Sequence, residues 1–273
     1  MTVSTTDEPT QLRLGTCSWS TKDWVGKFYT TTNASEFITE YARVYDTVEI
    51  DSTFYSTPRK EVVLAWRKRT PEGFLFAAKI PKTITHEKFL TDCDKDLEEF
   101  LATVSLLGSR LGPLLFQFPY YAKDKGITLK DFLAHLEPFL AKLPKDGFRF
   151  ALEVRNKTWL KPPLMDLLQA HGVTLALIDH PWMPRADELM KDERLVTGPF
   201  AYIRWLGDRY AIEKITTTWN QCVIDRSQDL EGWVPLIKRL LDKRIPVFGF
   251  VNNHYAGYAP DNVEHLKRVL NEA

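Results

Sequence analysis

The stretch FRFALEVRNKTW, residues 148–159, contains a short apolar run that ends in ionisable side chains. Its side chains alternate: Phe150 and Leu152 share one face, and Glu153 and Arg155 lie on the other. This alternation predicts a β-strand whose bulky apolar face packs against helices and whose charged side chains point the opposite way at the carboxyl end. The remainder of the chain repeats the same pattern.

Eight such runs begin near residues 12, 46, 74, 113, 148, 173, 200 and 246. Segments with helical periodicity lie between them, at 35–45, 59–69, 94–107, 128–143, 162–171, 230–243 and 261–270. Regular alternation of strand and helix favours parallel strands with right-handed crossovers, and eight units can close into a barrel. We therefore predict an α/β fold, a (β/α)8 TIM barrel that forms a single domain over residues 12–273, preceded by a flexible segment at 1–11.

The later part of the chain is less regular than the earlier part. Segment 185–199 has weak helical character, and segment 206–229 is too long for a simple turn, so we expect distorted units near strands six to eight. A doubly wound open sheet is the alternative fold. It is less favoured, because neither GxGxxG nor GxxxxGK[ST] follows the first apolar run.

Composition limits the partners of this 273-residue chain. Lys plus Arg and Asp plus Glu both number 36, so no net charge would draw the protein to an extended nucleic acid or an anionic membrane. No run approaches the roughly 18 apolar residues of a membrane span. Three widely spaced cysteines without a CxxC motif favour a reducing compartment. We expect a cytoplasmic protein with a small-molecule substrate, and the sequence does not indicate its oligomeric state.

Catalytic side chains of a TIM barrel come from the carboxyl ends of its strands. The alternation that turns Glu153 and Arg155 inward does the same for Glu49, Lys79 and Arg204. Asp179 also ends a strand, although it continues the face of Leu175 and Leu177 that should pack against helices. The sequence therefore predicts a nearly neutral cluster of acids and bases at one end of the barrel.

Several strings in the chain together resemble the YecE-like family, domain of unknown function 72. They are GTCSWS, VEIDSTFY, KIPKTITH, LGPLLFQFP, LEVRNKTW, YIRW and FVNNHYAGYAPDN. The resemblance covers about residues 12–270 and implies a TIM barrel with no established activity. Carried over position by position, it implies the motif residues Trp19, Glu49, Phe54, Tyr55, Lys79, Thr85, His86, Gln117, Pro119, Glu153, Arg155, Trp159, Asp179, Arg204, Asn252 and Asn253. The chain departs from the family at Trp205–Gly207, where a His-Gly pair is usual, and at His254, where an acid is more common.

The leading hypothesis is an enzyme that acts on a small polar or anionic substrate, sugar-like or phosphate-like, by general acid/base or lysine chemistry. We expect Lys79, Glu49, Glu153 and Asp179 to be catalytic, and a Schiff base at Lys79 is one version of this chemistry. The two arginines would clamp an anion. The full set expected to bind substrate is Arg155, Arg204, Trp19, Tyr55, His86, Gln117, Trp159, Asn252 and Asn253.

Two other functions remain open. A divalent metal could be held by Glu49, Glu153, Asp179 and either His254 or His86 in a hydrolase or isomerase. The neighbouring cations argue against this, and we predict no cofactor and no metal ligand. The third hypothesis is a binding module without turnover that holds a nucleotide, the end of a nucleic acid or a sugar.

Overall fold

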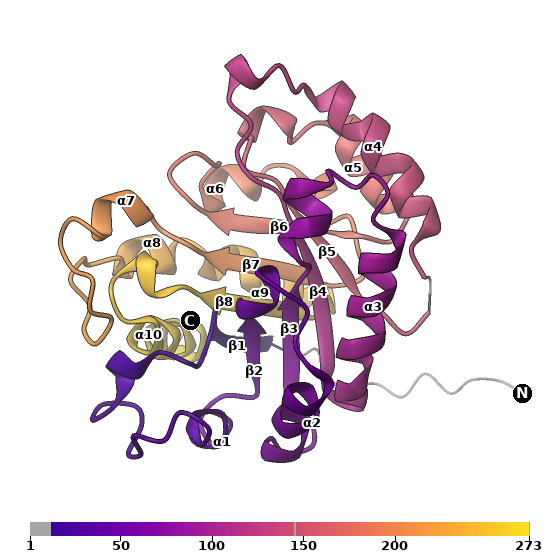
Figure 1. The fold of residues 1–273 in the computed structure, drawn as a ribbon. Coiled ribbons are helices and arrows are strands. Elements are labelled where there is room, and N and C mark those ends of the chain that lie inside the picture. The colour runs from indigo at the N-terminus through magenta and orange to yellow at the C-terminus, as the bar shows by residue number, and fades with distance from the viewer. Residues whose placement is uncertain (1–11, 145, 273) are drawn as a thin grey trace, which may run out of the picture.

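The computed structural model describes residues 12–144 and 146–272, so the segment predicted to be flexible, 1–11, lies outside the described residues. Eight parallel strands form one sheet in the order β1-β8-β7-β6-β5-β4-β3-β2, which curls into a nearly closed barrel. The predicted TIM barrel is confirmed (Figure 1). The strands are β1 (Leu12–Thr16), β2 (Thr47–Ile50), β3 (Leu75–Lys79), β4 (Leu111–Gln117), β5 (Phe150–Glu153), β6 (Thr174–Asp179), β7 (Ala201–Trp205) and β8 (Val247–Val251).

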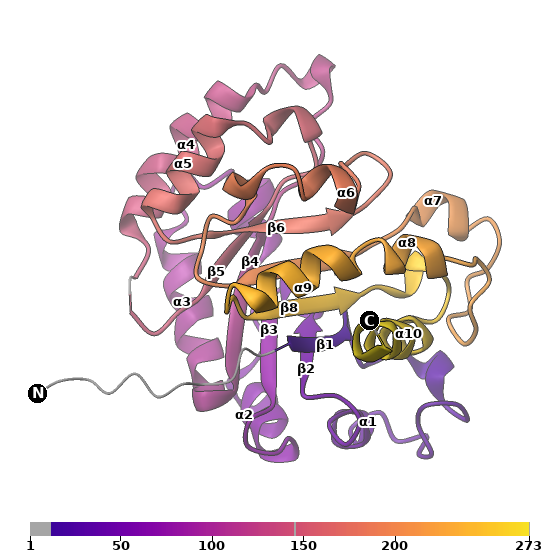
Figure 2. The same cartoon turned by 180° about the vertical axis from the view of Figure 1, so that it is seen from behind.

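Helices cover the outside of the strands, as the two opposite views show (Figures 1 and 2). They are α1 (Phe37–Tyr41), α2 (Lys60–Arg69), α3 (Asp94–Val104), α4 (Leu129–Lys142), α5 (Pro162–Ala170), α6 (Ala186–Leu189), α7 (Arg209–Ile212), α8 (Ser227–Glu231), α9 (Val234–Asp242) and α10 (Ala259–Glu272). Thr128 and Asp131 form a capping box at the start of α4, which satisfies backbone N–H groups there. No helix in the described part of the chain combines the length and apolar composition needed to cross a bilayer.

The distorted units expected near strands six to eight are present. Segment 185–199 contains only the short helix α6 and a 3-10 turn, η7 (Glu193–Leu195). The long connection after β7 contains α7 and α8 before the full-length helix α9. These irregular connections matter for function because they lie at the carboxyl ends of the strands.

The barrel has two apolar layers, which follow the alternation of side chains along each strand. Ala151 and Tyr202 belong to a small cluster inside the barrel. Phe150, Leu152 and Ile203 belong to the larger cluster between strands and helices. The alternation in the sequence therefore assigns the inner and outer faces of β5 and β7 correctly.

A tyrosine closes the seam between β1 and β2, the two ends of the sheet. The Tyr41 hydroxyl accepts a hydrogen bond from the Thr16 backbone N–H at 2.9 Å and donates to the Thr47 carbonyl at 3.2 Å. A side chain on Gly15 would not fit, because its Cβ would lie 2.2 Å from the Thr47 carbonyl oxygen. The strands are thus close enough to meet, and a side-chain hydroxyl bridges them at this point.

Candidate active site

A single arginine joins two glutamates in the interior of the barrel. Arg204, on β7, donates from Nη2 to Glu49 Oε1 at 2.7 Å and from Nη1 to Glu153 Oε2 at 2.5 Å. None of the three is more than 1% exposed. Buried charges are tolerated when they are paired and hydrogen-bonded. We call Glu49, Arg204 and Glu153 the buried triad, and it lies inside the barrel, near the carboxyl ends of β2, β5 and β7.

Two further donors complete the hydrogen bonds of the two glutamates, whereas the buried Nε of Arg204 has no partner among the described residues. The Tyr202 hydroxyl donates to Glu49 Oε2 at 2.6 Å, and Arg155 Nε donates to Glu153 Oε1 at 2.9 Å. Every carboxylate oxygen of the two glutamates therefore has a donor. Burial alone would raise the pKa of Glu153, but Arg204 and then Arg155 outweigh that effect and lower this pKa to about 2. Glu153 is thus an ionised anchor for two guanidinium groups.

Arg155 is the member of this assembly that reaches the solvent. Its side chain is 27% exposed, and it lies two residues beyond the end of β5. Nε is held by Glu153, while the two terminal nitrogens have no partner among the residues that the structure describes. A guanidinium held in this way can donate two parallel hydrogen bonds to a carboxylate or phosphate.

Lys79 lies in a separate ion pair at the end of β3. Its Nζ is 2.9 Å from Asp51 Oδ1 and 4.1 Å from the centre of the Phe54 ring. Burial opposes ionisation of Asp51, but Lys79 outweighs it, so the pKa of Asp51 lies below its usual value. Lys79 itself is only 6% exposed. A Schiff base at Lys79 would require this ion pair to be broken.

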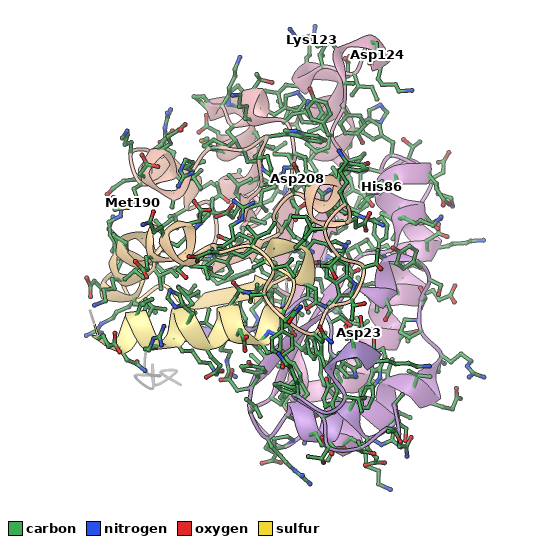
Figure 3. All side chains as sticks on the ribbon, turned by 90° about the vertical axis from the view of Figure 1, so that its left-hand side faces the viewer. Asp23, His86, Lys123, Asp124, Met190 and Asp208 are labelled. Atoms are coloured by element: carbon green, nitrogen blue, oxygen red, sulfur yellow. The ribbon has the colours of Figure 1, made fainter. Side chains whose placement is uncertain are left out.

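A cavity of about 400 Å³ opens over the ends of strands β3 to β7, and we call it the mouth cavity. Three of the predicted site residues line it: His86, Gln117 and Arg155. His180 and Asp208, from the loops after β6 and β7, also line it. Figure 3 shows His86 and Asp208 on adjoining parts of this face. The volume falls in the range of about 300–1,000 Å³ that is typical of small-molecule sites.

His86 brings an imidazole to the mouth cavity from η3 (Thr83–Glu87), a π-helical turn after β3. Its Nδ1 lies 2.8 Å from Thr85 Oγ1, and its ring packs edge-on against Phe54. Burial lowers the pKa of His86 to about 4, helped by the nearby charges of Lys79 and Arg155. The imidazole is therefore neutral at neutral pH. Its Nε2 has no partner in the described ranges and is available to accept or donate a proton.

Three predicted aromatic residues lie outside the lining of the mouth cavity. Trp19 is 7% exposed and packs edge-on against Trp66 on α2. Trp159 is 5% exposed and stacks on Tyr121. Tyr55 follows β2 and is 66% exposed. The two tryptophans therefore pack in the apolar layer between strands and helices, and Tyr55 stands at the rim.

Asn252 and Asn253 line a different, smaller cavity of about 200 Å³ together with Asp51. Asn252 Oδ1 accepts from the His254 backbone N–H at 2.9 Å. Asn253 Oδ1 accepts from the backbone N–H of Ala259, the first residue of α10, at 3.0 Å. Both amide oxygens thus organise the loop between β8 and α10.

Asp179 faces away from the buried triad, on the outer face of β6. Its Oδ2 accepts from Trp233 Nε1 at 2.8 Å and from the Tyr255 hydroxyl at 3.3 Å. It lines a third cavity, of about 580 Å³, together with Arg226 and Asp229 near α8 and α9. Burial raises the pKa of Asp179, and the hydrogen bond from Trp233 opposes that effect. Its catalytic role stays a prediction, separate from the chemistry of the mouth cavity.

The metal-dependent alternative depends on carboxylates that could share an ion. Within residues 12–144 and 146–272, no group of three or more His, Cys, Asp or Glu side chains is arranged to hold a metal. Glu49 and Glu153 do face a common partner, but it is Arg204. The charge that balances these two carboxylates is thus a guanidinium.

Sequence reasoning missed several residues of the mouth cavity. His180 directly follows the last residue of β6, so its position at a strand end was a usable signal. Asp208, Arg209 and Tyr210 lie in the long segment after β7, where no periodicity indicated which residues would turn toward the barrel. Tyr120, just after β4, also lines the cavity.

Comparison with known proteins agrees with the fold. A family model described as "Protein of unknown function DUF72" matches residues 13–273. The UPF0759 protein YecE of Escherichia coli strain K12 is 31% identical over 190 residues, which cover 66% of this chain and 65% of YecE. The UPF0759 protein YunF of Bacillus subtilis strain 168 is 26% identical over 283 residues, which cover 94% of each protein. The chain thus spans slightly less than two thirds of the E. coli relative.

Solved structures show the same architecture. A DUF72 family protein from Thermotoga maritima has a TM-score of 0.76 at 24% identity, with 96% of this chain and 99% of that chain covered. A D-psicose 3-epimerase, solved in the presence of D-fructose, has a TM-score of 0.53 at 12% identity, with 95% and 97% covered. At these identities the likeness shows the barrel fold alone.

Proposed function

This chain belongs to the DUF72 family of proteins of unknown function, and we propose that it is an enzyme that moves protons on a small anionic substrate bound in the mouth cavity. The observation that carries the proposal is Arg155, which lies in one cavity with a neutral histidine. A buried carboxylate holds this cation at Nε, and its terminal nitrogens have no partner within residues 12–144 and 146–272. An anchored cation beside an unprotonated base suits acid/base chemistry on an anion.

Each residue has a distinct role in this proposal. Arg155 binds the carboxylate or phosphate of the substrate, and His86 Nε2 takes or returns a proton. Gln117 and His180 offer hydrogen bonds to the uncharged part of the substrate. Glu153 acts through Arg155 and is a positioning residue, because its oxygens are occupied by the two arginines.

The cysteines support a reducing compartment such as the cytoplasm for this activity. Cys17, Cys93 and Cys222 are all free thiols, and the first two are buried. Disulfides form and persist mainly in oxidising compartments.

The test is proton exchange in D₂O with a panel of phosphorylated and carboxylated small molecules, followed by proton NMR. We expect loss of a C–H signal from at least one compound. His86→Gln should slow that exchange by about 10²–10⁴-fold, the usual contribution of a general base. Arg155→Met should weaken binding of the same compound, whereas Arg69→Met, at the exposed end of α2, should not.

The outcomes separate an enzyme from a binding module. A compound that binds in an Arg155-dependent manner but is neither exchanged nor converted would make this a binding protein without turnover. Exchange that survives His86→Gln unchanged would remove His86 from the mechanism.

A further inference from the structure

The mouth of the barrel carries exposed aromatic side chains. Four aromatic side chains in the described part of the chain are exposed: Tyr55, Tyr120, Trp182 and Tyr210, at 66%, 46%, 47% and 72%. They follow β2, β4, β6 and β7, all at the carboxyl ends of strands. Large aromatic rings gain free energy by burial, so their concentration at one end of a soluble barrel marks a surface that a ligand covers.

Two of these rings contact each other across the loops that follow β4 and β6. Tyr120 and Trp182 contact each other with ring centres 5.0 Å apart, and both line the mouth cavity. They come from the loops after β4 and β6, and β5 lies between those strands in the sheet. Arg155 follows β5, so the pair spans the position where the guanidinium enters the cavity. A ligand anchored on Arg155 therefore shares the mouth cavity with these two rings.

The cavity is larger than an anion alone requires. At about 400 Å³ it exceeds the roughly 30 Å³ of a water molecule by an order of magnitude, and an inorganic anion of a few heavy atoms would leave most of it empty. The ligand therefore has a second part besides its charged group.

The polar lining indicates the chemistry of that second part. Asp208 uses Oδ1 to accept from the Ala211 backbone N–H at 3.0 Å, and Oδ2 has no partner among the described residues. Gln117 donates its Nε2 to the Phe118 carbonyl at 2.7 Å, which leaves Oε1 as an acceptor. Free acceptor oxygens suit hydroxyl donors. The Tyr120 and Trp182 rings are inclined by 53°, so they do not form a parallel slot for a flat base.

We propose that the mouth cavity binds an anionic sugar, with its phosphate or carboxylate on Arg155 and its sugar ring against Tyr120 and Trp182. This inference rests on the proposed function for the anion site and adds the substrate class. The rings contribute apolar contact to the C–H face of the sugar, and Asp208 and Gln117 accept hydrogen bonds from its hydroxyls.

The test is calorimetric titration with glucose 6-phosphate, inorganic phosphate and AMP. We expect glucose 6-phosphate to bind about tenfold more tightly than inorganic phosphate, a difference of about 1.4 kcal/mol. The double variant Tyr120→Ala/Trp182→Ala should abolish that preference and leave the affinity for inorganic phosphate unchanged. Leu64→Ala, on α2, removes a side chain with the same 46% exposure as Tyr120 and should preserve the preference. The melting temperature of each variant should match that of the wild type, because all three side chains are exposed.

Failure of this inference and failure of the anion site give different results. Equal affinity for glucose 6-phosphate and inorganic phosphate, or a preference that survives the double variant, would overturn the sugar site. Tighter binding of AMP than of glucose 6-phosphate would also overturn it, in favour of a base on the same rings. If Arg155→Met leaves binding of inorganic phosphate unchanged, the proposed function fails as well.

Discussion

Glu153 and Arg155 lie two residues apart, face the same way, and are joined by a 2.9 Å hydrogen bond from Arg155 Nε to Glu153 Oε1. The Glu153 side chain is completely buried and also forms an ion pair with Arg204, whereas Arg155 lines the mouth cavity. The buried carboxylate of Glu153 therefore orients the guanidinium of Arg155 at the mouth of the barrel. The consequences for stability and for binding can be tested separately.

Removal of Arg204 should destabilise the protein severely. Arg204→Met leaves Glu49 and Glu153 buried without their shared cation, and breaking a buried ion pair in this way costs about 3–5 kcal/mol. Arg204→Lys keeps the charge, but one ammonium does not reproduce the forked contact, so its loss should be intermediate. Urea unfolding measures both. A loss below about 1 kcal/mol for Arg204→Met would show that the triad contributes little to the fold.

Acid should weaken the fold through Glu153. The pKa of this carboxyl is lowered from 4.5 to about 2 in the folded chain, because Arg204 and Arg155 outweigh the effect of burial. The unfolded chain therefore takes up the proton first, and the stabilisation is lost as the pH falls from about 4.5 toward 2. The loss is on the order of 3 kcal/mol. Urea midpoints over this range should fall less steeply for Glu153→Gln than for the wild type, and identical slopes would contradict the assignment.

His86 should titrate near pH 4. Burial, with Lys79 and Arg155, lowers its pKa, so any reaction that needs the neutral imidazole should lose rate only as the pH falls toward about 4. The unfolded chain takes up this proton near pH 6.5, so His86 also reduces stability as the pH falls from 6.5 to 4. NMR of the ring protons gives the midpoint directly. Lys79→Met should raise it, and a midpoint near 6.5 in the wild type would show that His86 is solvated.

Tyr41 should hold the seam of the barrel. Tyr41→Phe leaves the Thr16 N–H and the Thr47 carbonyl without this partner in a buried position, at a cost of about 1–3 kcal/mol. Hydrogen exchange at the Thr16 amide should accelerate as well. Tyr45→Phe is the matched control, since the Tyr45 hydroxyl contacts the Pro260 carbonyl at 3.4 Å and the Glu264 side chain, both on α10, and does not bridge two strands. Equal effects of the two variants would show that the seam does not depend on the Tyr41 hydroxyl.

Alternation along single strands was enough to predict which charges enter the barrel. Glu49, Lys79, Glu153 and Arg204 were placed inward by their spacing alone, and all four are buried in the structure. The same rule placed Asp179 on the outer face of β6, where it contacts Trp233. These assignments succeed because side chains alternate between the two faces of any strand, so that the face of a residue follows from the local sequence alone.

The pairing of those charges could not be predicted from the sequence. Arg204 contacts Glu49 and Glu153 because barrel closure brings β7, β2 and β5 to a common interior, and no local pattern specifies which strands face each other. The prediction that Arg204 clamps substrate assumed a free guanidinium, whereas both of its terminal nitrogens are occupied. The sequence also did not predict that Asp208, Arg209 and Tyr210, in the segment after β7, line the mouth cavity, because the turns of this segment depend on tertiary contacts.

Asp179 provides the remaining test of where the chemistry takes place. Its carboxylate accepts hydrogen bonds from Trp233 and Tyr255, and burial raises its pKa above the usual value of an aspartate. Asp179→Asn keeps an acceptor oxygen without the charge and should change stability by less than about 1 kcal/mol, whereas Asp179→Leu removes the acceptor and should cost about 1–3 kcal/mol. A raised carboxyl pKa makes stability decline as the pH rises above 3.8, so Asp179→Asn should also remove that part of the pH dependence. This effect is opposite in sign to that of Glu153.

Substrate conversion in the mouth cavity should be unaffected by Asp179→Asn. If the variant is stable but loses all turnover, the reaction takes place in the cavity beside α8 and α9, and Asp179 is its acid or base.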